Sequence, residues 1–124
     1  MSEHAASGES DFLGRLSELL ARSQQSYQGY MERGKTFLYA SRLKDSNDAI
    51  RHLILENAHL LPQEQQRNAQ KLLHHLDAWS RHWEACHLRL QPELTDTFVF
   101  DSEVRFPGAE VAALMDYHHR RVRR

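Results

Sequence analysis

Apolar side chains recur at alternating spacings of three and four residues along the first part of the chain, which is the pattern of one face of an α-helix. The series follows Ser10 and Asp11, two residues that commonly cap helix N-termini, and its members are Leu13, Leu16, Leu20, Ser23, Tyr27, Tyr30, Gly34 and Phe37. We therefore expect a long amphipathic helix from residue 11. Gly29 and Gly34 each weaken a helix interior, so the pattern allows either a break near residues 33 to 35 or a continuous helix.

Two further helices are expected in the middle of the chain. Residues 44 to 48 are rich in side chains that bond to their own backbone, so a turn and a new helix start are predicted there. Leu55 falls outside the apolar face of this second helix, which is formed by Ile50, Leu53, Ile54, Asn57 and Leu61. Pro62 suits the first position of the next helix, whose apolar face is Ala69, Leu72, Leu76, Trp79, Trp83, Cys86 and Leu90. Such faces must be covered by other helices.

The pattern changes after Pro92. Apolar residues then occupy alternate positions on either side of Asp101 and Ser102, namely Phe98, Phe100, Val104 and Phe106. This spacing predicts a short β-like hairpin or an extended segment over residues 95 to 106. Pro107 suits the start of a last helix, with Val111, Leu114, Met115 and His118 on one face. The expected fold class is mostly α, a three- to four-helix bundle with the 95–106 segment packed across it.

Length and composition favour one domain. The 124 residues are 40% hydrophobic and 27% charged, which is enough apolar material for one core. We expect a disordered leader over residues 1 to 10, a single helical domain over residues 11 to 119, and a basic C-terminal tail over residues 120 to 124. The chain shows neither a membrane-spanning apolar run nor a secretory leader, and Cys86 is the single cysteine. These features predict a cytoplasmic protein without an intrachain disulfide.

Charge is balanced except at the C-terminus. The net charge of −1 gives no overall attraction to nucleic acid or to an anionic membrane. The tail concentrates four arginines: Arg120, Arg121, Arg123 and Arg124. Arginines at a helix C-terminus complement the helix dipole, which is a structural role. They are also the candidate partner-binding residues, for an acidic protein surface or, only through this tail, for nucleic acid.

Residues Gly29 to Thr36 match the phosphate-binding pattern G-x-x-x-x-G-K-[ST]. That chemistry needs an apolar strand directly before the loop, whereas residues 21 to 28 are polar and continue the helical pattern. Tyr30, Met31 and Glu32 are also poorly suited to a loop that wraps anionic phosphates. A small nucleotide-binding protein is therefore the less favoured interpretation of this segment.

Two Glu-x-x-His pairs, Glu56 with His59 and Glu84 with His87, have the spacing found in ferritin-like di-iron bundles. Each pair lies near the C-terminal end of its predicted helix, and the two helices are joined tightly. In such a hairpin Glu84 lies about 27 Å along the helix from the first pair. One chain cannot bring the pairs together, so a metal-binding, ferritin-like enzyme would need an assembly of chains. Solvated histidines are the favoured interpretation.

These considerations lead to one preferred function class. Cys86 lies on a predicted buried face, and no serine or cysteine nucleophile has an identifiable base in the sequence. The two regular apolar faces and the position of Leu55 make self-association plausible. We therefore expect a noncatalytic helical interaction or regulatory module without cofactor or metal, whose partner is a protein and possibly a second copy of the chain.

Overall fold

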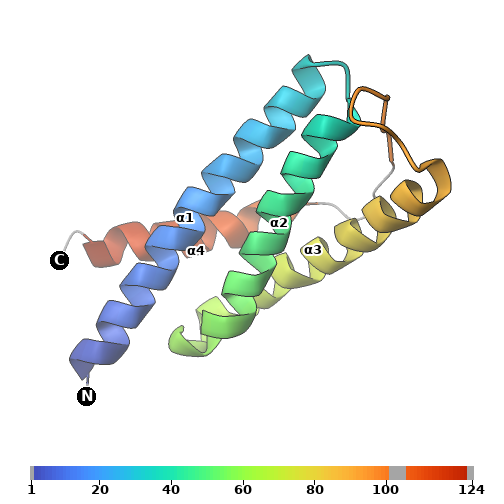
Figure 1. The fold of residues 1–124 in the computed structure, drawn as a ribbon. Coiled ribbons are helices and arrows are strands. Elements are labelled where there is room, and N and C mark those ends of the chain that lie inside the picture. Colours follow the sequence, from blue (N-terminus) through green and yellow to red (C-terminus); the bar gives the residue numbers. More distant parts are fainter. Residues whose placement is uncertain (1, 101–105, 123–124) are drawn as a thin grey trace.

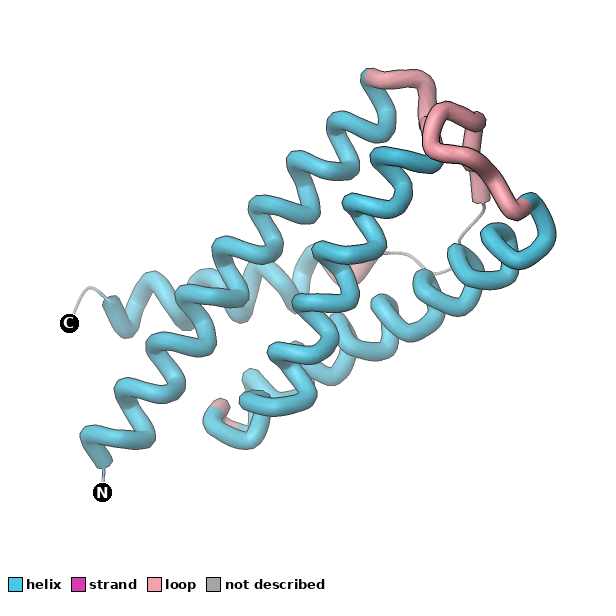
Figure 2. The backbone as a smooth tube through the Cα atoms, viewed as in Figure 1, coloured by secondary structure: helices cyan, strands magenta, loops and turns pink. Residues whose placement is uncertain are grey.

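The chain is mostly helical in the computed structural model, which describes residues 2 to 100 and 106 to 122. The elements are α1 (Ser2–Glu32), α2 (Phe37–Asn57), the short 3₁₀ helix η1 (Ala58–Leu60), α3 (Gln63–Leu90) and α4 (Gly108–Val122). Figure 1 shows α1 and α2 side by side, α3 diverging from α2, and α4 crossing behind them. Figure 2 shows helices and loops over the described residues, and no strand. The mostly α fold class is confirmed. None of these helices is long and apolar enough to cross a lipid bilayer.

The first helix begins earlier than its apolar pattern indicates. Residues expected as a disordered leader belong to α1, which starts at Ser2 and not near Ser10. In this added stretch Glu9 makes a contact that the apolar pattern does not reveal: its side chain is buried, and its carboxylate accepts a hydrogen bond from Tyr117 of α4.

The break allowed near residues 33 to 35 is present. Gly34 adopts a left-handed conformation with φ of 79°. The Lys35 amide donates to the Tyr30 carbonyl at 2.9 Å, a bond typical of a glycine-terminated helix end. The chain then reverses, and α2 begins at Phe37.

The predicted turn at residues 44 to 48 is wrong, because this segment lies inside α2. Its polar side chains bond to other residues and not to their own backbone. Ser23 of α1 donates to Asn47 at 2.6 Å, and Lys44 pairs with Asp48 one turn away at 2.7 Å. Once such partners are available, these residue types no longer favour a turn.

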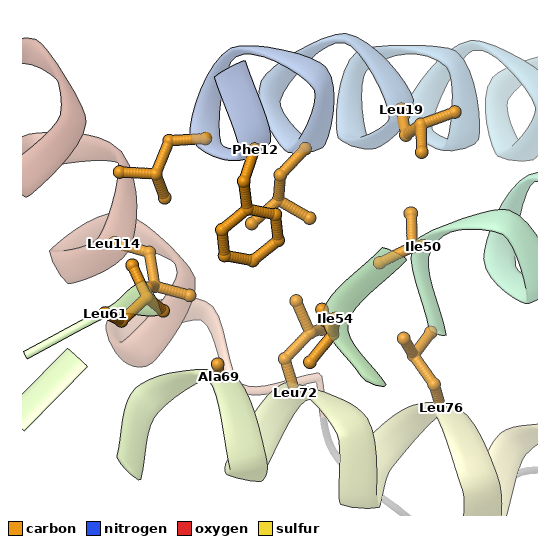
Figure 3. Close-up of a cluster of buried hydrophobic side chains, with 11 residues drawn as sticks. Phe12, Leu19, Ile50, Ile54, Leu61, Ala69, Leu72, Leu76 and Leu114 are labelled. Atoms are coloured by element: carbon orange, nitrogen blue, oxygen red, sulfur yellow. The ribbon is translucent and has the colours of Figure 1, made fainter. Parts of the chain in front are cut away.

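All four α-helices contribute to the main core. Its buried members are Phe12, Leu13, Leu16, Leu19, Ile50, Ile54, Leu61, Ala69, Leu72, Leu76 and Leu114. Figure 3 shows Phe12 pointing from α1 into the space between Leu114 of α4 and Ile54 of α2. Each fully buried leucine or isoleucine contributes about 1.5–3 kcal/mol relative to exposure. This cluster therefore holds α4 across α1 and α3.

A second, aromatic cluster fills the space between α2 and α3 where they have diverged. The segment between α3 and α4 runs back to the start of α2 and inserts Phe98, which is fully buried. The Phe98 amide donates to the Lys35 carbonyl at 2.8 Å, and its carbonyl accepts from the Tyr30 hydroxyl at 2.5 Å. Trp83 donates to the Ala40 carbonyl at 3.1 Å. This cluster fixes the angle between α2 and α3.

The β-like hairpin expected over residues 95 to 106 is not found in the described part of that range. Thr97 forms an isolated antiparallel bridge with Thr36 of the α1–α2 turn. The side chains do alternate, since Phe98 points inward and Val99 is exposed. The predicted hairpin turn at residues 101 and 102 lies outside the described residues.

Candidate functional site

A charged groove lies between α2 and α3. The two helices diverge from the η1 end of α2 towards its N-terminus (Figure 2), so their outer side chains cannot interdigitate along the whole length. The groove has a volume of about 510 Å³ and is lined by Lys44, Asp48, Arg51, Asp77, Ser80, Arg81 and Glu84. Six of these seven residues carry charge, and the two signs are equally represented. The groove therefore has a pattern of charge but no net charge.

Lys44 anchors one end of the groove. Its ammonium lies 2.7 Å from the Asp48 carboxylate and 3.5 Å from the Glu84 carboxylate, so it links the two walls. The same ammonium lies 5.5 Å from the ring centroid of Trp83, within the range of a cation–π contact. Its side chain is 12% exposed. The aromatic cluster and the groove thus share this residue.

Arg51 and Asp77 form the ion pair at the other end of the groove. The hydrogen bond and the charge of Asp77 raise the pKa of Arg51 above its usual value. Both side chains remain partly exposed, at 44% and 36%. An exposed pair contributes little to folding stability. These two side chains are accessible to another molecule.

The charges follow an ordered sequence on each wall. Residues spaced four, three and four apart lie along one side of a helix. On α2 this row is Lys44, Asp48, Arg51 and then Leu55. On α3 it is Asp77, Arg81, Glu84 and then Leu88. The signs read plus, minus, plus on α2 and minus, plus, minus on α3.

The two leucines at the ends of these rows are exposed. Leu55 is 53% exposed and Leu88 is 76% exposed. Because α2 and α3 are antiparallel, the leucines lie beyond opposite ends of the charged groove. Arg81 lies between them and has no ion-pair partner among residues 2 to 100 and 106 to 122. The groove face therefore combines two apolar side chains with one cation that the rest of the described chain leaves unpaired.

The C-terminal arginines do not belong to this groove. Arg121 lies 3.0 Å from the buried carboxylate of Glu9 and donates to the Tyr117 hydroxyl at 3.1 Å. Burial and the bond to Glu9 together raise the pKa of Tyr117. Arg120 donates to a carbonyl of its own helix at 3.4 Å. Arg123 and Arg124 lie outside the described residues.

Arg120 and Arg121 also line a smaller hollow of about 370 Å³ at the start of α3. Its other lining residues are Pro62, Glu64, Gln65 and Tyr117. Since Arg121 already pairs with Glu9, much of the positive charge at this hollow is compensated within the chain. Arg121 therefore has a structural role that the sequence analysis did not predict, which is its ion pair with Glu9.

The Gly29–Thr36 segment is the end of a helix followed by a turn. Residues 29 to 32 are the last turn of α1, and the residues before them are helical, so the strand required before a phosphate-binding loop is not formed. Its two glycines have packing and turn roles. A Cβ at Gly29 would lie 2.8 Å from the Tyr39 ring, and Gly34 provides the left-handed residue of the turn.

The two Glu-x-x-His pairs remain separate. Glu56 lies 2.8 Å from His52, one turn earlier on the same helix. Glu84 belongs to the groove, and His87 stacks on Phe37 with ring centroids 5.1 Å apart. Among the described residues no group of three or more histidine, cysteine or acidic side chains is placed to hold a metal ion.

The groove is not predicted in the sequence analysis, although the sequence contains a signal for it. Residues 44, 48 and 51 and residues 77, 81 and 84 carry charges at helical spacing and in inverse order. Such rows indicate pairing between antiparallel helices once the direction of the helices is known. The buried contact of Glu9 has no comparable signal, because its partner Tyr117 lies 108 positions further along the chain.

Fold and groove together define the class of protein as a small α-helical bundle with a charged groove between two of its helices. Comparisons with protein-family models, with curated proteins and with solved structures found no match for this chain.

Proposed function

We propose that this chain is a noncatalytic helical interaction or regulatory module that binds a protein partner through the α2/α3 groove face. By groove face we mean the groove residues together with Leu55 and Leu88. One observation carries the proposal: a charged groove flanked along its own helical rows by two leucines that are 53% and 76% exposed.

The composition of this face suits a protein partner. Burying an exposed leucine contributes about 1.5–3 kcal/mol, so Leu55 and Leu88 can serve as apolar anchors. The central charges set the orientation of a partner, because a wrong register brings like charges together. Arg81 adds a guanidinium, the cationic group most enriched in protein interfaces. The face thus offers affinity at its ends and specificity at its centre.

The surroundings of Leu88 give further support. More exposed apolar side chains occur at the ends of α1 and α3 and in the segment that follows α3: Tyr27, Met31, Leu90, Leu94 and Val99, each between 47% and 55% exposed. Figure 1 shows that these chain segments lie at the same end of the molecule. Clusters of exposed apolar side chains commonly mark interaction surfaces.

Photocrosslinking in the cells that make the protein tests the proposal. A photoreactive phenylalanine analogue at position 88 should form a covalent adduct with a protein, and so should the analogue at position 55. The matched control is position 25, an exposed glutamine on the outer side of α1. Adducts from positions 88 and 55 but not from 25 support the proposal. No adduct from the groove face, or equal adducts from all three positions, would overturn it.

A further inference from the structure

We propose that the partner of the groove face is a second copy of this chain, bound about a two-fold axis that runs along the groove. In this dimer α2 of each copy packs antiparallel on α3 of the other. The inference rests on the proposed function, since it names the partner of the same face.

Charge order identifies the partner. The α2 row reads plus, minus, plus and the α3 row reads minus, plus, minus, and the two rows already face each other within one chain through the Lys44–Glu84 and Arg51–Asp77 pairs. A two-fold axis along the groove moves α2 sideways onto α3 without sliding it lengthwise. The register is therefore kept, and each charge of one copy faces the opposite charge of the other. Because the charge rows of α2 and α3 are opposite at matching positions within one chain, they are also opposite between two copies.

Helix geometry singles out the same axis. When the axis bisects the angle between α2 and α3, each α2 overlies the α3 of the other copy along its full length, whatever that angle is. A two-fold axis across the groove instead places α2 on α2, where Lys44 and Arg51 would meet cations of the same row. Like charges in direct opposition are unfavourable. The axis along the groove is thus the closed, self-complementary solution.

Apolar residues complete both ends of the contact. Leu55 lies one turn beyond Arg51, so in the second copy it faces the turn of α3 before Asp77, which carries the partly buried Leu73. Leu88 lies one turn beyond Glu84, so it faces the first turns of α2 in the second copy, which begin at the partly buried Phe37. In the dimer the two exposed leucines of each chain would therefore be removed from water and would pack against apolar neighbours.

Arg81 gains its missing partner in the same arrangement. Asp48 lies between Lys44 and Arg51 in its row, as Arg81 lies between Asp77 and Glu84. Asp48 is 47% exposed and its side chain pairs within the chain with Lys44. In the dimer Asp48 of one copy faces Arg81 of the other, twice by symmetry. This pair is the central contact of the interface.

Such an interface is polar at its centre, so the dimer should be weak and sensitive to salt. Sedimentation equilibrium of the full chain over a range of concentrations measures it directly. We expect a monomer–dimer equilibrium at low salt that shifts towards monomer at high salt.

Variants test the register. Arg81→Glu should weaken dimerisation at least about tenfold, because two symmetric contacts are reversed. Arg22→Glu is the matched control on α1: it makes the same charge change at an exposed arginine and should leave the dimer unchanged. The double variant Asp48→Lys with Arg81→Glu restores opposite charges between copies and should recover dimerisation. Leu88→Glu should weaken it as well, because it places a charge at a side chain that is 76% exposed and lies at the end of the contact. Melting temperatures confirm that each variant is folded.

The outcomes separate this inference from the proposed function. A chain that is monomeric at all concentrations, or a dimer that responds equally to Arg81→Glu and Arg22→Glu, overturns the second copy as partner. Loss on Arg81→Glu with recovery in the double variant supports it. If position 88 crosslinks to a different protein while the chain is monomeric, the inference fails and the interaction module stands. If position 88 crosslinks to nothing and the chain is monomeric, both fail.

Discussion

The contact between Glu9 and Arg121 should decide how firmly α4 is held, and removing the arginine is its sharpest test. The Glu9 side chain is 8% exposed; it accepts a hydrogen bond from Tyr117 and forms an ion pair with Arg121, both on α4. Replacing Arg121 with methionine keeps the apolar part of the side chain but removes its charge. The carboxylate of Glu9 then stays buried with Tyr117 as its described partner on α4. A buried charge that loses its counter-ion is destabilising.

The expected magnitude follows from the burial of the two side chains. Hydrogen bonds to charged groups contribute about 1.5–3 kcal/mol, and loss of one partner of a fully buried pair costs about 3–5 kcal/mol. Arg121 is 33% exposed, so solvent already screens part of this interaction. We therefore expect Arg121→Met to lower the free energy of unfolding by about 1.5–2.5 kcal/mol.

Urea unfolding followed by circular dichroism at 222 nm measures the effect. The matched control is Arg120→Met, at the neighbouring arginine, which bonds to a carbonyl of its own helix. It should change the free energy of unfolding by less than about 0.5 kcal/mol. The double variant Glu9→Met with Arg121→Met removes both charges and should recover a large part of the loss. Equal effects of Arg121→Met and Arg120→Met, or no recovery in the double variant, would refute the reasoning.

Three further predictions concern packing and protonation. Gly29→Ala should be about 1–3 kcal/mol less stable than Gly14→Ala in thermal unfolding, because a Cβ at Gly29 meets the Tyr39 ring at 2.8 Å while a Cβ at Gly14 meets nothing within 4 Å; equal stabilities would contradict this. Phe98→Ala should cost about 3–5 kcal/mol in urea unfolding and shift the tryptophan fluorescence, whereas Val99→Ala, at a 48% exposed side chain, should cost less than about 1 kcal/mol. Burial, and after it the neighbouring His119, lower the pKa of His118. The stability that this lowering contributes is therefore present above the unfolded pKa of about 6.5 and is lost as pH falls through the lower folded value. His118→Gln should flatten the pH dependence of the free energy of unfolding in that range.

The helical period is most informative on α3. All seven apolar positions predicted for the third helix lie on one side of α3; the six from Ala69 to Cys86 are buried, and Leu90, at the end of the helix, is 47% exposed. Here the period alone identifies the core, because side chains at alternating spacings of three and four residues must point the same way.

The same period was less informative on α1. Tyr27 belongs to the predicted apolar face but is 53% exposed. Short α4 packs on α1 through contacts that include Glu9, in the N-terminal half of that helix, and beside the later positions α1 has α2 as its neighbour (Figure 1). A helix period shows which side chains share a face, but the length and direction of the neighbouring helix decide which of them are buried.

Polar residues explain the remaining differences, and they also connect the fold to the proposed interface. The pattern predicts a turn that includes Asn47, yet this residue lies inside α2 and accepts a hydrogen bond from Ser23 of α1. Glu9 falls in the expected leader, yet it contacts α4 through Tyr117 and Arg121. In both cases the sequence shows a hydrogen-bonding group but not its partner, which comes from another helix. The groove charges differ in that their order and the antiparallel course of the two helices can both be read from the sequence, whereas the register, which places Lys44 near Glu84 and Arg51 near Asp77, cannot. With the register known, Arg81 stands out as the lining cation for which the described chain provides no ion pair, and the proposed dimer would place Asp48 of a second copy opposite it.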